Sequence, residues 1–113
     1  MEEFIRTGWL LGVYGPLLSQ RQKDVMDQHF LQDLSLSEIA QNLGITRQAV
    51  HELVQRCTKQ LEEYEEKLGW GERAYLLTKH LKLAQKLAHT GPVNKLHEEL
   101  AFALAQLEEY DGV

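Results

Sequence analysis

The stretch from Leu34 to Gln55, LSLSEIAQNLGITRQAVHELVQ, constrains the fold more than any other part of the chain. It has the layout of a helix-turn-helix, which is a short helix, a tight turn containing glycine and a second, recognition helix. Ser35 and Glu38 have the spacing of a capping box, which predicts where the first helix begins. Gly44 follows that helix and can adopt the left-handed conformation that a sharp exit needs. Thr46 can then cap the recognition helix.

Apolar residues occur at the offsets that would bury the inner faces of both helices. These residues are Ile39, Leu43, Ile45, Val50, Leu53 and Val54. Ala40 is small, so the second helix can cross the first closely. No single position is diagnostic, but the combination of small, glycine and apolar residues predicts a helix-turn-helix, with an ordinary helical hairpin as the alternative.

The recognition helix is expected to continue well past the motif, because residues 55–68 contain no helix breaker. Leu61, Tyr64 and Leu68 extend its apolar seam. This outer end also carries four acids, Glu62, Glu63, Glu65 and Glu66. We interpret them as a solvated face. They would repel phosphate, so this end is not expected to lie along a nucleic-acid backbone.

Two further helices are expected before the motif. The first covers about residues 3–14 and is broken by Gly15-Pro16. The second begins at Ser19, which has Gln22 at capping-box spacing, and ends near Gln32. This second helix and the motif are expected to form a three-helix module, which the apolar first helix precedes.

A glycine-rich break, Gly69-Trp70-Gly71, predicts a domain boundary, with a helix-turn-helix domain at 1–69 and an extension at 70–113. The extension shows two amphipathic segments, 73–89 and about 93–110, separated by Thr90-Gly91-Pro92. They are expected to form a helical hairpin whose wide apolar faces need a partner, which could be the first domain, each other or a second subunit. A stripe of lysines, Lys79, Lys82 and Lys86, lies on the other side of the first segment. The predicted fold class is therefore all-α.

Composition limits the range of functions. The chain has 113 residues, 43% of them hydrophobic, and a net charge of −5, which argues against a protein that coats nucleic acid through bulk attraction. The only cysteine, Cys57, has no disulfide partner within the chain and is interpreted as a structural residue. The apolar start is too short to span a bilayer and lacks a secretory layout, so we expect a soluble cytoplasmic protein with no membrane association.

An enzyme is not expected. The sequence has no phosphate-binding glycine loop, no Cys/His metal spacing and no convincing nucleophile set, so neither a cofactor nor a metal is predicted. The five histidines are scattered over different predicted helices. The acidic pairs Glu98-Glu99 and Glu108-Glu109 are interpreted as solvated helix faces and not as catalytic carboxylates.

Several of these motifs together resemble a known family. They are Leu17-Leu18-Ser19, the run SLSEIA from Ser35 to Ala40, the run TRQAV from Thr46 to Val50 and the run LEEYEEKL from Leu61 to Leu68. In this combination, residues 4–68 resemble the YlxM-like family of small bacterial helix-turn-helix proteins. More distantly, residues 17–68 resemble the promoter-binding fourth region of bacterial sigma factors.

The YlxM resemblance implies a biological context. Members of that family are associated by gene neighbourhood with the signal recognition particle, the ribonucleoprotein that targets nascent membrane proteins. The resemblance therefore implies a regulatory or accessory protein of that pathway, with the proteins or the RNA of the particle as candidate partners.

Direct nucleic-acid binding is the first functional hypothesis, because the early residues of a recognition helix face the major groove. The candidate contact residues are Arg47, Gln48, His51, Glu52, Gln55, Arg56 and Lys59. Arginine can bind guanine and glutamine can bind adenine through paired hydrogen bonds. With RNA as the target, shape and phosphate contacts would dominate, and the lysine stripe could take part.

Two alternatives remain open at this point. One is a DNA-binding transcriptional regulator, for which a homodimer would strengthen weak binding. The other is a protein-interaction adaptor that uses the helix-turn-helix only as a scaffold, since this fold alone does not establish DNA binding.

Overall fold

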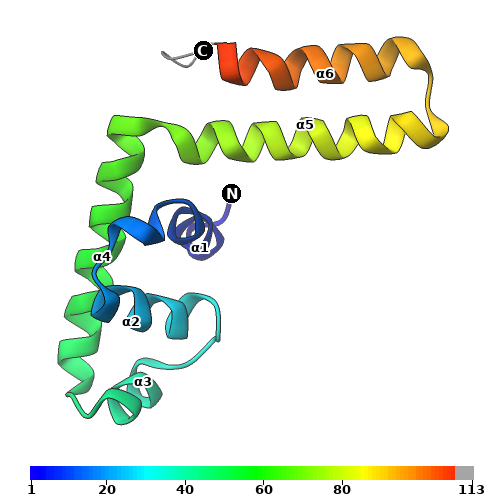
Figure 1. Cartoon of the computed structure of the whole chain (residues 1–113). Helices are drawn as coiled ribbons and strands as arrows, with labels where there is room; N and C mark the ends of the chain where they lie inside the picture. The colour runs from blue at the N-terminus through cyan, green and yellow to red at the C-terminus, as the bar shows by residue number, and fades with distance from the viewer. Residues whose placement is uncertain (109–113) are drawn as a thin grey trace. The chain divides into compact units, whose positions relative to one another are not determined.

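The computed structural model describes residues 1–108, and all its regular secondary structure is helical (Figure 1). The helices are α1 (Glu3–Tyr14), the 3₁₀ turn η1 (Gly15–Leu17), α2 (Gln20–Phe30), α3 (Leu36–Leu43), α4 (Arg47–Leu68), α5 (Trp70–Thr90) and α6 (Val93–Glu108). This confirms the all-α prediction. Packing divides the chain into a first unit, Met1–Leu68, and a second unit, Gly69–Val113.

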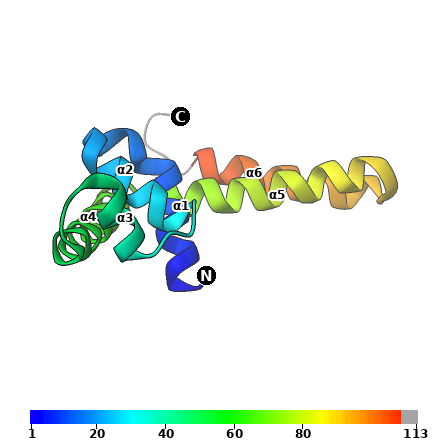
Figure 2. The ribbon, with the colours of Figure 1, turned by 90° about the horizontal axis from the view of Figure 1, so that it is seen from below.

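The first unit is assembled on α4. Helices α1, α2 and α3 all pack against it, and Figure 2 shows the three on one side of α4. The fully buried side chains of these helices include Leu10 of α1, Met26 of α2, and Cys57 and Leu61 of α4. Because α1, α2 and α3 all pack against the same long helix, their positions in the first unit depend on α4.

The helix-turn-helix core forms as the sequence predicts. Its buried centre consists of Val25, Ile39, Ala40 and Val50, and the residues packed around it are Leu34, Leu36, Leu43, Ile45, Leu53 and Val54. The capping boxes at Ser19 and Ser35 are both formed, each with the expected partner three residues on. Gly44 has φ 68° and ψ 33°, the left-handed conformation, and the Thr46 hydroxyl accepts the amide hydrogen of Ala49 at 3.0 Å.

The acidic end of α4 is the main correction in the first unit. Glu62 is not simply solvated, because both its carboxylate oxygens accept hydrogen bonds from the Arg6 guanidinium at 2.8 and 2.9 Å. Glu65 is buried and accepts a 2.6 Å hydrogen bond from the Tyr14 hydroxyl. These two acids attach α4 to α1, so only Glu63 and Glu66 remain exposed as predicted.

The second unit is a hairpin of α5 and α6, which pack against each other. Its first helix begins at Trp70, three residues before the expected start, because the left-handed Gly69 alone separates it from α4. The second helix begins at Val93 as predicted, and its predicted end at Tyr110 lies outside the described residues.

One polar pair joins the two hairpin helices. His80 Nδ1 lies 2.7 Å from Glu99 Oε2, and the His80 ring stacks on Phe102 with centroids 5.4 Å apart. The interpretation of Glu99 as a solvated acid is therefore wrong, although Glu98 and Glu108 are exposed. Glu109 lies outside the described residues.

Candidate nucleic-acid interface

The exposed face of α4 begins in its first turn. Gln48, Glu52, Gln55 and Lys59 follow one another at intervals of three or four residues, so they lie on one side of the helix. All four are exposed, as is Arg56 beside them. The inner side of the same turns carries Val50, which is fully buried in the helix-turn-helix core.

Arg47 and Gln48 occupy the first two positions of α4, and both side chains are exposed. Their position follows from the turn, since Gly44 reverses the chain and Ile45 anchors it in the core. The amino end of a helix carries partial positive charge, which favours an approaching anion such as a phosphate. This end of α4 therefore combines one fixed cation with the dipole of the helix.

The basic side chains of this face are available to a ligand. Among the described residues, Arg47, Arg56 and Lys59 form no salt bridge. By contrast, Lys23 on α2 is paired with Asp27 at 2.9 Å, and this hydrogen bond raises the pKa of the lysine. Arg21, which also lies on α2, is exposed.

Two predicted contact residues differ from the others. His51 is only partly exposed, because it lies at the edge of the buried side of α4. Glu52 is exposed, and its carboxylate accepts a 3.3 Å hydrogen bond from the Gln48 amide. This bond holds the two side chains together, and a base contact by Gln48 would have to compete with it.

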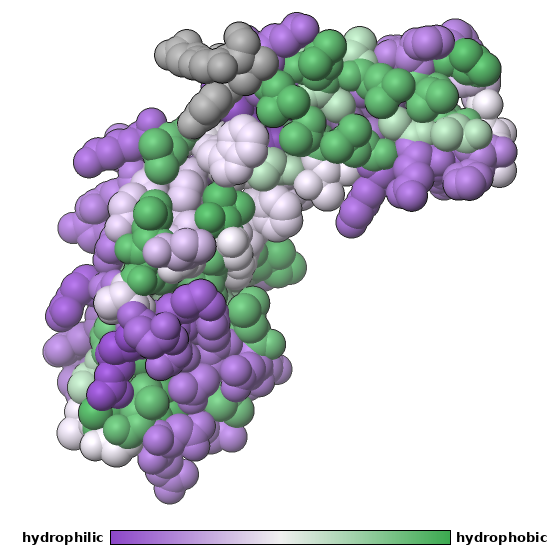
Figure 3. Space-filling model, viewed as in Figure 1, coloured by the Kyte–Doolittle hydropathy of each residue, from purple (hydrophilic) through white to green (hydrophobic). Residues whose placement is uncertain are grey.

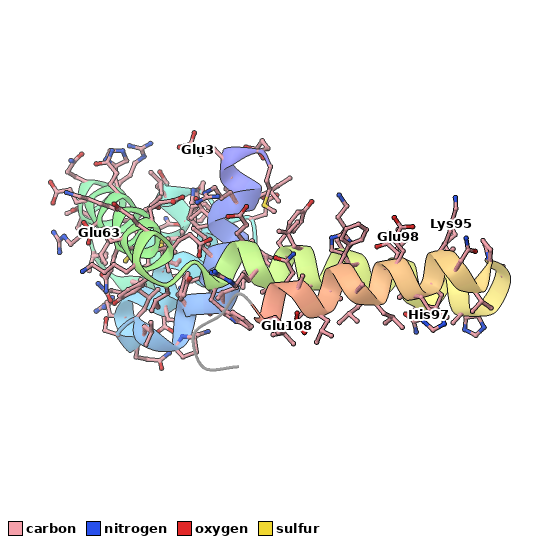
Figure 4. The ribbon with its side chains drawn as sticks, turned by 90° about the horizontal axis from the view of Figure 1, so that it is seen from above. Glu3, Glu63, Lys95, His97, Glu98 and Glu108 are labelled. Atoms are coloured by element: carbon pink, nitrogen blue, oxygen red, sulfur yellow. The ribbon has the colours of Figure 1, made fainter. Side chains whose placement is uncertain are left out.

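The exposed face changes character along α4. After Lys59, the next exposed positions on this side are Glu63 and Glu66, and Figure 4 shows Glu63 on the outside of the helix. Because carboxylates repel phosphate, a nucleic acid would contact only residues 47–59. The six exposed contact residues and the partly exposed His51 all lie within this segment.

Within residues 1–108, no three or more histidine, cysteine, aspartate or glutamate side chains are grouped so that they could hold a metal ion. Cys57 is fully buried, and burial raises the pKa of its thiol, which disfavours the reactive thiolate. None of the described helices is long and apolar enough to cross a membrane.

A surface cavity of about 310 Å³ beside α1 was not anticipated from the sequence. Its lining residues are Glu2, Glu3, Phe4, Thr7, Phe30 and Thr58. Phe4 packs on Phe30 with ring centroids 4.7 Å apart, a contact between helices that no local pattern could indicate. Two carboxylates at its rim make it unsuitable for phosphate.

A family comparison settles what kind of protein carries this motif. The profile of the family described as "Putative helix-turn-helix protein, YlxM / p13 like" matches residues 1–102. The chain belongs to this family. The match extends beyond residues 4–68 and covers α5 and the first part of α6.

Individual proteins named UPF0122 are also similar to this chain in sequence. A UPF0122 protein of Bacillus cereus strain AH187 is 36% identical over 112 residues, which cover 96% of this chain and 99% of the relative. A UPF0122 protein of Clostridium kluyveri is 48% identical over 69 residues, or 61% of this chain, and one of Symbiobacterium thermophilum is 46% identical over 70 residues, or 62% of this chain. These two matches span 62% and 65% of the relatives' own lengths.

Proposed function

We propose that the chain binds nucleic acid through the first half of α4 and acts as a regulatory or accessory protein. The observation that carries this proposal is the exposed set of Arg47, Gln48, Gln55, Arg56 and Lys59 on a helix whose start is fixed by the Gly44 turn. Double-stranded DNA is the favoured target, because the major groove admits such a helix and its bases match arginine and glutamine.

Charge sets how strong this binding can be. Residues 1–68 carry seven basic and eleven acidic side chains, and two of the basic ones, Arg6 and Lys23, are occupied in salt bridges. Long-range attraction is therefore weak, and affinity must come from contacts made locally by residues 47–59. A protein of this kind selects its site by base contacts more than by bulk charge.

The proposal is tested by selecting a preferred duplex from a random DNA pool and measuring its affinity for two matched variants. Arg47→Ala/Gln48→Ala removes one cation and one amide from the start of α4. Gln85→Ala/Lys86→Ala likewise removes one cation and one amide, from exposed positions of α5. The first variant should weaken binding by about 5- to 150-fold and relax the sequence preference, as expected for loss of a base contact.

The two variants also separate DNA from RNA as the target. If binding to DNA and to the signal recognition particle RNA is unchanged in Arg47→Ala/Gln48→Ala, direct recognition by α4 is wrong. Loss of RNA binding in Gln85→Ala/Lys86→Ala alone would instead assign the contact to the lysines of α5. Retained helical circular dichroism in both variants excludes unfolding as the cause.

An adaptor role is the second candidate, favoured by the acidic balance of residues 1–68 and by the exposed apolar side chains of the second unit. The signal recognition particle is the context that the family resemblance suggests for it. Immobilised chain would be presented separately with the particle's purified protein and RNA. Capture of the protein component alone supports the adaptor, and capture of neither component contradicts both particle-linked roles.

A further inference from the structure

The hairpin of α5 and α6 leaves most of its large apolar side chains uncovered. When two helices pack as a pair, each buries only the stripe of side chains that faces the other helix. In the described part of this unit, the fully buried apolar side chains are the small Ala84 and Ala103. The large apolar residues that stay exposed include Leu81 (46%), Leu83 (41%), Leu100 (43%), Phe102 (46%) and Leu104 (52%). Large contiguous apolar patches are rare on the surfaces of soluble monomers.

The exposed apolar residues lie on two sides of the hairpin. Ala84 and Ala103 mark the contact line between the helices, and Leu81 and Ala88 are rotated from Ala84 by roughly 60° and 40° at about 100° per residue. On α6, Leu100, Val93 and Leu104 are rotated from Ala103 by roughly 60° to 100° in the same sense. Because the helices are antiparallel, equal rotations bring all five residues to one side, which we call the leucine face.

Figure 3 shows hydrophobic atoms gathered along one side of α5 and α6. Figure 4 shows Lys95 and Glu98 pointing to one side of α6, and His97 and Glu108 to the other. The five residues of the leucine face itself carry no charge, whereas the side with Leu83 and Phe102 also carries the His80–Glu99 pair.

Charge is divided unequally between the two helices. The described part of α5 has four basic residues and one acidic residue, whereas α6 has one basic residue and three acidic residues. A partner helix that lies along α5 is therefore favoured if it is acidic, and one along α6 is favoured if it is basic. A second copy of the hairpin offers an acidic helix for α5 and a basic helix for α6, and it also carries the same apolar face.

We propose that the leucine face is the interface of a homodimer, in which two hairpins form a four-helix bundle. The α5 of one copy lies against the α6 of the other, so that basic and acidic helices alternate. Bundles of four helices are a stable way to cover hairpins of this kind, and a two-fold interface requires only one self-complementary surface. On α6 the face runs from Val93 to Leu104, which makes it about 17 Å long at the rise of an α-helix.

The test is sedimentation velocity of the whole chain over a range of concentrations, without nucleic acid. The mass obtained from the sedimentation of the wild-type chain should be twice the 13.0 kDa of one chain. Leu81→Glu should raise the dimer dissociation constant by at least about tenfold, since it buries an unpaired carboxylate in the interface. Leu83→Glu is the matched control, because it makes the same change two residues away on the other side of α5, and it should leave the dimer intact.

Two outcomes would overturn the proposal: a monomeric wild-type chain, or equal effects of Leu81→Glu and Leu83→Glu. If Leu81→Glu lowers the helical content, Leu104→Gln replaces it as the milder change on the same face. Lys82→Glu tests the arrangement of the helices and should weaken the dimer, whereas Lys67→Glu on α4 should not. Equal dissociation constants for these two variants would contradict the pairing of α5 with α6.

Because sedimentation is measured without nucleic acid, a monomeric result leaves the proposed function standing. Conversely, failure to bind DNA or RNA leaves the dimer untouched. If both proposals hold, each dimer presents two copies of residues 47–59, and the weak contact of one copy is reinforced by the second.

Discussion

Two side-chain contacts, a salt bridge and a hydrogen bond, join α1 to the last turns of α4. The Arg6 guanidinium forms a two-pronged salt bridge with Glu62, whose side chain is 43% exposed. One turn further on, the Tyr14 hydroxyl donates a hydrogen bond to the buried Glu65. Partners separated by 56 and 51 residues meet only after α1 has docked. The sequence could indicate acidic residues here, but it could not indicate their partners.

The Arg6–Glu62 contact predicts a pH dependence of stability. The hydrogen bond from Arg6 lowers the pKa of Glu62 below its ordinary value. A carboxyl whose pKa is lower in the folded state contributes stability that is present above its unfolded pKa, about 4.3, and is lost as the pH falls through the folded pKa. Because the pair is partly exposed, the loss should be no more than about 1 kcal/mol.

Urea denaturation of the wild-type chain and of Glu62→Gln at pH 7 and pH 3 measures this loss. The free energy of unfolding should differ between the two proteins at pH 7 and converge at pH 3. A difference that persists unchanged at pH 3 would mean that the carboxylate charge is not what stabilises the contact.

Within elements, the start and end of each helix follow from local chemistry. The capping boxes at Ser19 and Ser35 and the left-handed Gly44 were all predictable, because they depend on residues no more than a few positions apart. The start of α5 was predicted three residues late, since Trp70-Gly71 looks like a break but continues as helix after Gly69. Contacts between elements, such as His80 with Glu99 and Phe4 with Phe30, depend on packing angles that local patterns do not specify.

The turn between α3 and α4 predicts a graded effect of substitutions at Gly44. A side chain there would have free space, since an added Cβ meets nothing within 4 Å, so any cost comes from the backbone conformation at φ 68°. Gly44→Ala should destabilise the first unit by about 1 kcal/mol or more, whereas Gly44→Asn should cost less, because asparagine tolerates this conformation better.

Thermal or urea denaturation of the two variants provides the measurement. Gly8→Ala is a suitable control, because Gly8 lies within α1 with no positive φ and has equally free space for a methyl group. That change should leave stability unchanged or increase it. Equal losses in Gly44→Ala and Gly44→Asn would show that backbone conformation is not the deciding factor.

For the whole molecule, nucleic-acid binding has to be reconciled with an acidic chain. The net charge of −5 is distributed so that Arg47, Arg56 and Lys59 lie in the first thirteen residues of α4, while Glu63 and Glu66 follow on its exposed side. The family relationship accounts for the helix-turn-helix but leaves the target open, because the same scaffold can serve as an adaptor. Function as a nucleic-acid-binding protein therefore depends on whether residues 47–59 of α4 make the contact.

The salt dependence of DNA binding tests that claim most directly, using Lys59→Ala with Lys67→Ala as its control. Both lysines are exposed on α4, but Lys67 lies in its last turn, beyond the acidic residues. If residues 47–59 contact the backbone, Lys59→Ala should weaken binding and reduce the slope of log affinity against log salt by about 1, while Lys67→Ala leaves both unchanged. Equal slopes for the wild-type chain and both variants, or a larger effect of Lys67→Ala, would contradict the assignment of nucleic-acid binding to the first half of α4.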